Sequence, residues 1–399
     1  MSDAPIMALD GGILASLARP GARVALADGC GSPRAAYPAL SALARERGDL
    51  RLLTGWLPGP VDGLDLDAFA DARTVMPGWG LRRAAEAGHV RTVPARLSAV
   101  PALVAGPLRP DLLVLAAAPG PVGPVLGAEV SWVRAVIDLG VPLAVVLDPE
   151  LPRAAAGPPL PDAQVFVLGE APGGPHVHIA ATPSAEHEAI GRHVAALLTD
   201  GVRLQWAPGQ LGAAVVDGVR AAGVRVHADS GLLGDGVVAL DQAGLLLSDP
   251  VATYLVGSPE LYAWADARGR AGRPVVHRIE HTHDPSRLSG DPPLVSVNTA
   301  VEIDLDGQVN VEGTRTALVG GIGGHPDYAA AAARSVRGLS VIALASGHRG
   351  RSTRVERLSR PVTTASHDVD VVVTEHGPAD LRGLDRDERR HALDRIFPS

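Results

Sequence analysis

Short apolar runs alternate along the first half of the chain with segments whose apolar residues recur at helical spacing. The helical segments include Gly80 to Ala87 and Val130 to Leu139. The apolar runs lie at Arg23 to Ala27, Leu50 to Trp56, Asp111 to Ala118, Pro142 to Asp148 and Ala163 to Leu168. Strand and helix segments that alternate at this length predict a mostly parallel β-sheet covered by helices.

The same rhythm resumes in the second half, after an interruption rich in proline and glycine. The interruption includes Pro152 to Pro161 and Ala171 to Pro175. Helical spacing then returns in Ser184 to Leu198, and the apolar run Val202 to Ala207 leads into a helical segment at Gly212 to Ala222. The second half is therefore predicted to be another layered α/β structure.

Two domains are the natural expectation for this pattern, because a chain of 399 residues exceeds what one hydrophobic core usually supports. We expect an α/β protein with two open, mostly parallel domains, one at residues 1–180 and one at residues 181–399. Within the second domain, Asp306-Gly307 between two apolar runs predicts a β-hairpin. Asp385, followed in the next turn by Glu388, predicts a capping box at the start of a helix.

Composition excludes several classes of function. The net charge is -8 and no basic run occurs, so neither nucleic acid nor an anionic membrane is an expected partner. The chain has arginine but no lysine, which excludes pyridoxal-phosphate catalysis and a Walker A phosphate loop. The single cysteine, Cys30, excludes an internal disulfide, and no apolar stretch reaches the roughly 18 residues of a membrane span. We expect a soluble, cytoplasmic protein.

Three glycine-rich turns are candidates for ligand binding. The segment Val226 to Gly236 follows the apolar run Val224 to Val226, a predicted strand, and combines glycines with carboxylates. Gly320 to Gly324 precedes a predicted helix at Asp327 to Arg337, so its backbone N–H groups could face an oxyanion or a phosphate. Asp28 to Pro33 follows a strand in the same way. The alternative in each case is a plain turn between a strand and a helix, and both interpretations stay open at this point.

Two other motifs contain residues that are typical of catalytic or metal sites. His277 to Asp284 offers enough ligands for a metal ion, but it runs into Pro285 and lacks the helical spacing of a zinc-protease motif. A surface loop is the favoured interpretation, and we expect no metal site. Asp229-Ser230-Gly231 resembles the signature of aspartic proteases, which requires two such triplets, whereas the chain has one.

Three C-terminal motifs, taken in order, resemble the signatures of one family. They are Val297 to Asn310, Gly320 to Asp327 and Val373 to Gly383, which read VNTAVEIDLDGQVN, GGIGGHPD and VTEHGPADLRG. The first half resembles the same family more loosely, at Asp28 to Pro33 and Val93 to Leu97. Together these stretches resemble the acetyl-CoA hydrolase/transferase family, whose 4-hydroxybutyrate CoA-transferases belong to the class I CoA-transferases.

The resemblance implies two open α/β domains with an active site in the cleft between them. Transferases of this family use a glutamate carboxylate that attacks the acyl-CoA thioester and then carries CoA as a glutamyl thioester to a second carboxylic acid. Coenzyme A is thus part of the substrate, and no permanently bound cofactor is expected. The implied partners are an acyl-CoA and a carboxylic acid, with a homodimer as the candidate assembly. The residues implied to bind the substrate are Gly320, Gly321, Gly323, Gly324, Glu375, Gly377, Asp380 and Arg382.

The catalytic glutamate of the family is replaced in this chain. Its stretch has the form His-Thr-Glu-Met-x-Ser-Asp-Gly, and alignment on Asp235-Gly236 puts Gly231 at the glutamate. Glycine has no carboxylate, so a glutamyl thioester cannot form at this position. Asp229 is the candidate substitute as nucleophile or general base, because alternate residues of a strand point to the same side.

Three hypotheses about function follow. The first is an acyl-CoA thioester-processing enzyme, either a CoA-transferase or an acyl-CoA hydrolase. The second is an enzyme of the same fold that performs different acyl or condensation chemistry on a specialised CoA-linked or carrier-linked substrate. The third is a non-catalytic CoA-binding protein.

Overall fold

The computed structural model describes residues 9–398, which divide into two compact units. The first unit comprises residues 9–95, 99–177 and 253–279. The second comprises residues 96–98, 178–252 and 280–398. The chain therefore passes between the units more than once. The compact units do not test independent folding, so the division into domains at residues 1–180 and 181–399 remains a prediction.

The first unit is built, within the described residues, on a seven-stranded sheet in the order β4-β3-β2-β1-β5-β6-β7, and all its neighbouring strands are parallel. The strands are β1 (Arg23–Leu26), β2 (Arg51–Thr54), β3 (Asp71–Thr74), β4 (Arg91–Thr92), β5 (Leu112–Ala117), β6 (Leu143–Leu147) and β7 (Val165–Glu170), with the short β11 (Tyr254–Leu255) outside the sheet. The helices are α1 (Gly11–Leu17), α2 (Tyr37–Arg47), α3 (Arg82–Ala87), α4 (Val100–Ala105), α5 (Val133–Ile137) and α9 (Pro259–Arg270). Short 3-10 helices are η1 (Arg34–Ala36), η2 (Leu66–Ala68) and η4 (Asp162–Gln164), whereas η3 (Leu97–Ala99) begins in the second unit and ends in the first.

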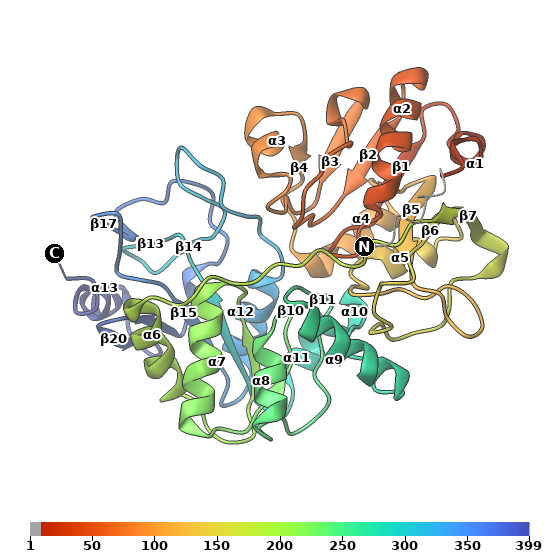
Figure 1. The fold of residues 1–399 in the computed structure, drawn as a ribbon. Helices are drawn as coiled ribbons and strands as arrows, with labels where there is room; N and C mark the ends of the chain where they lie inside the picture. The colour runs from red at the N-terminus through yellow and green to blue at the C-terminus, as the bar shows by residue number, and fades with distance from the viewer. Residues whose placement is uncertain (1–8, 399) are drawn as a thin grey trace. The chain divides into compact units, whose positions relative to one another are not determined.

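The strand order of this sheet reverses at β1. Strands β2, β3 and β4 extend one side of β1, whereas β5, β6 and β7 extend the other (Figure 1, red to yellow). In doubly wound sheets, ligands bind at the carboxyl ends of the strands where the order reverses. The turn Asp28 to Pro33 follows β1 at this point. Strand β5 is buried at every position, as expected for a central strand covered on both faces.

The second unit has a six-stranded sheet, counted over the described residues, in the order β20-β19-β15-β12-β8-β9. Its neighbours are parallel except for β19 and β20, which form an antiparallel pair. The strands are β8 (Arg203–Trp206), β9 (His227–Ala228), β12 (Leu294–Thr299), β15 (Leu339–Ala343), β19 (Val371–Thr374) and β20 (Gly377–Asp380). Outside this sheet lie β10 (Leu232–Leu233), β13 (Glu302–Asp304), β14 (Val309–Asn310), β16 (Gly347–His348), β17 (Arg351–Ser352) and β18 (Arg354–Val355).

Helices cover both faces of this second sheet. The helices of this unit are α6 (Ala185–Ala195), α7 (Gln210–Ala222), α8 (Gly236–Gln242), α10 (Ile279–Thr282), α11 (Pro285–Ser289), α12 (His325–Arg334), η5 (Ser366–Asp368) and α13 (Arg386–Asp394). The connections β8–α7–β9 and β12–α12–β15 run in opposite directions along the strand order, so right-handed crossovers place α7 and α12 on opposite faces. Helices α6, α7 and α8 lie side by side (Figure 1, green), and α11 packs beside α12. The strand order reverses between β8 and β12.

The predicted α/β class with mostly parallel sheets is confirmed by both units. Two local predictions are also confirmed. Asp306-Gly307 lies in the turn between β13 and β14, which pair antiparallel. The side chains of Asp385 and Glu388 make the capping box that starts α13.

One strand prediction is wrong. The run Val224 to Val226 is not a strand, and β9 begins only at His227. The reason is the end of the preceding helix: α7 stops at Ala222, and Gly223 takes the left-handed conformation with φ of 67°. The next residues are used to turn the chain, so Val226 makes only an isolated bridge to Leu246.

Among the described residues, no helix combines the length and hydropathy needed to cross a membrane. Helix α7, for example, has 13 residues, whereas a spanning helix needs about 20.

Candidate active site

Three of the sequence motifs meet the same edge of the second unit's sheet. Strand β9 runs into Ser230 and Gly231, the loop Gly320 to Gly324 leads into α12, and Glu375 directly follows β19. Because parallel strands end at one edge of a sheet, the loops that follow them line that edge. The candidate residues therefore gather at the carboxyl edge of this sheet.

The glycine loop, residues Gly320 to Gly324, presents backbone N–H groups at the N-terminus of α12. The N–H of Gly320 donates to Glu312 O at 3.2 Å, whereas the N–H groups of residues 321–324 have no acceptor among the described residues. Gly323 has φ of 58°, a conformation that glycine adopts without strain. Unpaired N–H groups at a helix N-terminus favour an anionic ligand.

A segment from the N-terminal half holds this loop in place. The N–H of Leu97 donates to Gly323 O at 3.0 Å. Ser98 donates to Asp327, in the first turn of α12, through its Oγ at 2.6 Å and its N–H at 3.1 Å. Burial raises the pKa of Asp327, and Arg96 brings its guanidinium to 4.0 Å from this carboxylate. The loop is thus a fixed feature with a positive charge beside it.

Gly231, at the position assigned to the family glutamate, lies against the imidazole of His283. A Cβ at Gly231 would lie 3.1 Å from His283 Nε2, and a Cβ at Gly324 would lie 2.3 Å from the same atom. His283 is 1% exposed, and its ring meets that of Tyr328 edge-on with centroids 5.1 Å apart. Burial lowers the pKa of His283 to about 3, so the ring is neutral at neutral pH.

The surface-loop interpretation of His277 to Asp284 is wrong for Thr282 and His283, whereas Glu280 and His281 are exposed. Thr282 is 0% exposed and His283 is 1% exposed, because α10 and α11 fold this segment against α12. Within the described part of the chain, no group of three or more histidine, cysteine or acidic side chains could hold a metal ion. His283 is therefore a buried residue of the candidate site that sequence reasoning missed.

The Gly324→Ala variant is expected to be destabilised by about 1 to 3 kcal/mol, because the added methyl overlaps His283 Nε2 in a packed site. Urea-induced unfolding measures the effect. Gly320→Ala is the matched control in the same loop, since a Cβ there meets nothing within 4 Å. Equal free energies of unfolding for the two variants would contradict the packing of His283 against Gly324.

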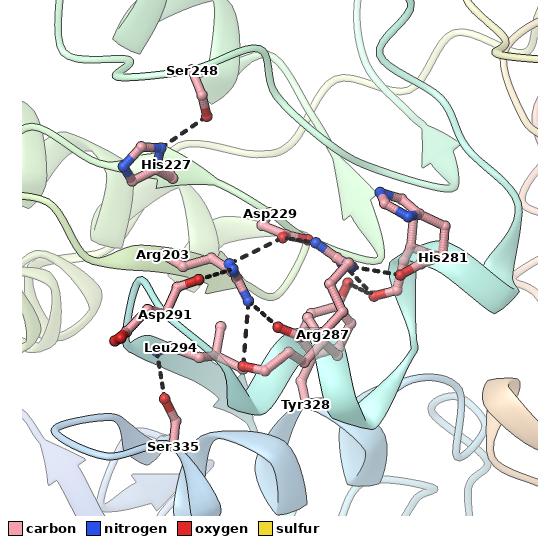
Figure 2. Close-up of polar contacts among 12 residues, drawn as sticks. Arg203, His227, Asp229, Ser248, His281, Arg287, Asp291, Leu294, Tyr328 and Ser335 are labelled. Carbon is pink, nitrogen blue, oxygen red and sulfur yellow. Dashed lines mark hydrogen bonds and ion pairs between the residues drawn. The ribbon is translucent and has the colours of Figure 1, made fainter.

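Asp229 lies in a buried cluster with two arginines (Figure 2). Arg287 donates to both carboxylate oxygens, and its Nη2 lies 2.9 Å from Oδ1. Arg203 Nε lies 3.4 Å from Oδ2, and its other nitrogens donate to the carbonyls of Arg287, Leu288 and Asp291. The Asp229 side chain is 5% exposed. Both oxygens are engaged, which favours a structural role, and the catalytic role of Asp229 stays a prediction.

The motif Val373 to Gly383 covers the end of β19 and all of β20, so its candidate residues lie at opposite ends of this hairpin. Glu375 accepts hydrogen bonds from Ser346 N at 2.9 Å and Ser346 Oγ at 2.5 Å. Burial works to raise the pKa of Glu375, but these hydrogen bonds outweigh it and the pKa is lowered. The antiparallel register puts Gly377 beside the carboxyl end of β19 and Asp380 at its start. Asp380 and Arg382 form an exposed ion pair there, away from Glu375 and Gly377.

A second group of buried acids lies where the first unit's sheet reverses, and it was not predicted. Asp28 Oδ2 accepts hydrogen bonds from Tyr254 OH at 2.7 Å and Trp132 Nε1 at 3.0 Å. Glu129 Oε2 accepts one from Gly31 N at 3.0 Å. Burial raises the pKa of Asp28 to about 6 and that of Glu129 to about 8. The glycine turn at Asp28 was a signal, but nothing in the sequence connects it with Glu129.

Comparison with known proteins agrees with these motifs. Residues 257–396 match the model of the acetyl-CoA hydrolase/transferase C-terminal domain. The 4-hydroxybutyrate coenzyme A transferase of Clostridium kluyveri is 30% identical over 221 residues, which cover 52% of this chain and 50% of that protein. Residues 257–396 therefore carry the C-terminal domain of the acetyl-CoA hydrolase/transferase family.

Two solved structures share the fold of this chain. RipA from Yersinia pestis aligns with a TM-score of 0.86 and 22% identity over 98% of this chain and 93% of that one. The 4-hydroxybutyrate CoA-transferase of Porphyromonas gingivalis aligns with a TM-score of 0.76 and 21% identity over 97% and 93%. The chain spans about half the length of the Clostridium kluyveri relative. The alignment of Gly231 with the family glutamate stays a prediction.

Proposed function

We propose that this acetyl-CoA hydrolase/transferase family member acts on acyl-CoA thioesters, as a hydrolase or a CoA-transferase. The observation that carries the proposal is the run of unpaired N–H groups of residues 321–324, among the described residues, at the start of α12. Such donors stabilise the negative charge that develops on a thioester carbonyl oxygen. The Clostridium kluyveri relative is named as a CoA transferase, which supports the same substrate class.

The proposed reaction has no glutamyl-CoA intermediate at residue 231, because Gly231 supplies no carboxylate. Hydrolysis then needs only water as the second substrate, whereas CoA transfer needs a carboxylic acid acceptor as well. Coenzyme A enters as part of the substrate, and the proposal includes no permanently bound cofactor. A homodimer and a cytoplasmic location stay predictions from the sequence.

Incubation of the purified full chain with a panel of acyl-CoAs tests the proposal. We expect release of free thiol above the rate of each acyl-CoA alone, or formation of a new acyl-CoA when a carboxylic acid is added. The Gly324→Ala variant is expected to lose this activity, because the methyl displaces His283 or the loop. A product whose mass fits neither hydrolysis nor exchange would favour different acyl chemistry, and acyl-CoA binding without turnover would contradict an enzyme.

A further inference from the structure

The Nε2 atom of His283 lies where two separate motifs meet. Gly231 is at the position assigned to the family glutamate, and Gly324 ends the glycine loop. A Cβ at these two positions would lie 3.1 Å and 2.3 Å from Nε2. The glycine at position 324 is what allows the imidazole to come this close, and at position 231 a Cβ would require the ring to shift slightly. The ring therefore fills space that a glutamate side chain at position 231 would need.

The other contacts of the ring hold it in this orientation. Nδ1 lies 2.8 Å from Thr282 Oγ1. The carbonyl of Thr282 is fixed in turn, because it accepts hydrogen bonds from Tyr328 OH at 2.9 Å and Arg287 Nη2 at 3.1 Å. Nε2 has no hydrogen-bond partner in the described part of the chain. Buried polar atoms are nearly always paired, so an unpaired one at a candidate active site indicates a ligand.

We propose that His283 is a catalytic residue that occupies the place of the missing glutamate and donates its Nε2–H to the carbonyl oxygen of the acyl-CoA thioester. This inference rests on the proposed function and names a residue for it. In this role Thr282 Oγ1 donates its hydrogen to Nδ1, which leaves the imidazole hydrogen on Nε2. Nε2–H then acts on that oxygen together with an N–H group of the glycine loop.

For hydrolysis, the step balances with water as the only co-reactant. A bond forms between the water oxygen and the thioester carbon, and the electron pair of the carbonyl double bond moves onto the oxygen that His283 contacts. This pair returns as the C–S bond breaks, and the C–S electron pair leaves on the sulfur of CoA. One proton of water passes to that sulfur, so the products are the carboxylic acid and the CoA thiol.

Electrostatics favour a hydrogen-bond donor over a general base. Burial first, and the charge of Arg287 second, lower the pKa of His283 to about 3. A base this weak accepts a proton from water only at a high energetic cost, since efficient bases have pKa values near the working pH. A neutral imidazole, in contrast, can polarise a carbonyl group through its N–H.

Two substitutions at His283 separate chemistry from packing. His283→Phe keeps a ring beside Tyr328 and removes the nitrogen, and we expect kcat for acyl-CoA hydrolysis to fall about 100-fold to 1,000-fold with little change in KM. His283→Gln keeps an N–H donor and is expected to retain more activity than His283→Phe. Circular dichroism and thermal unfolding establish the folded fraction of each variant, so that rates refer to folded protein.

The glutamate position provides the reciprocal test. Gly231→Glu alone is expected to be inactive and less stable, because its side chain meets the imidazole at the Cβ. Gly231→Glu combined with His283→Ala removes the obstacle, and the introduced carboxylate is expected to form a CoA thioester that intact-protein mass spectrometry detects after addition of acyl-CoA. A folded double variant without this adduct would contradict the placement of His283 in the glutamate's space.

The experiments distinguish failure of the proposed function from failure of the proposed role of His283. If the wild-type protein releases thiol from no acyl-CoA and exchanges with no acid, the proposed function is overturned, and the role of His283 with it. If the wild-type protein turns over and folded His283→Phe has the same kcat, only the role of His283 is overturned.

Discussion

In the Asp229→Asn variant, the free energy of unfolding is expected to fall by about 3 to 5 kcal/mol, with kcat per folded molecule unchanged. Asparagine keeps the shape of the side chain but removes the charge that Arg287 and Arg203 share. These three side chains are at most 21% exposed, so water cannot replace the lost anion. Urea-induced unfolding gives the stability change, and the acyl-CoA assay gives kcat.

The exposed pair of Asp380 and Arg382 is the matched control for this prediction. It has the same two-point geometry, with contacts of 2.9 and 2.6 Å, but its side chains are 53% and 51% exposed. Asp380→Asn is therefore expected to change the free energy of unfolding by no more than about 1 kcal/mol. If Asp229→Asn costs as little as the control, or abolishes turnover while the protein stays folded, the structural role of Asp229 is refuted and a chemical role is favoured.

The parts of the structure that could be predicted from the sequence are those that local patterns of apolar and polar residues determine. Apolar runs and helical spacing predicted the parallel sheets, since burial on both faces requires continuous apolar strands. The loop at Gly320 to Gly324 was placed correctly before a helix, although α12 begins at His325 and ends at Arg334, earlier than predicted. The helix ends early because Ser335 is extended and Arg337 takes a positive φ of 65°.

The contacts of the candidate site could not be predicted in the same way. His283 reaches Gly231 and Gly324 only through the packing of α10, α11 and α12, and no periodic pattern encodes such contacts. Its sequence neighbours pointed to a surface loop. Asp229 is a candidate for catalysis from the sequence because it follows a predicted strand. Its ion-pair partner Arg287 could not be predicted, because it lies on α11, far away in the sequence.

The hydrogen-bond partners of Glu302, a buried acid, could not be predicted from the sequence either. Its position in an apolar run suggested a strand, and it does lie in β13. Its partners come from two other segments: Asn310 Nδ2 donates to it at 3.0 Å, and Ser359 donates through N at 2.8 Å and Oγ at 2.7 Å. The strand could be inferred from the sequence. The hydrogen-bond donors to Glu302 could not, because they come from segments that only the tertiary fold brings together.

The stability of the protein is expected to decrease as the pH rises from about 6.5 to about 8, and Glu129 is the main cause. Below about pH 6.5 the buried, neutral His283 and His325 act in the opposite direction, because only the unfolded chain charges them there. Burial, together with the charge of Asp28, raises the pKa of Glu129 from its ordinary value of 4.5 to about 8. The folded state therefore holds a proton in this range that the unfolded chain has already released. A raised pKa contributes stability that is complete below the unfolded pKa and is lost as the pH rises through the folded pKa.

Glu129→Gln should remove most of this pH dependence, because the amide carries no charge at any pH in the range. Each pH unit in this range corresponds to about 1.4 kcal/mol for one proton, so the wild-type free energy of unfolding is expected to fall by about 2 kcal/mol across the range. Asp28, whose pKa burial raises to about 6, has lost most of its contribution below this range, so the variant should show little decrease. Urea-induced unfolding at several pH values measures both profiles, with Glu46→Gln as a control because Glu46 is exposed. Parallel profiles for Glu129→Gln and the wild type would show that Glu129 does not hold the proton.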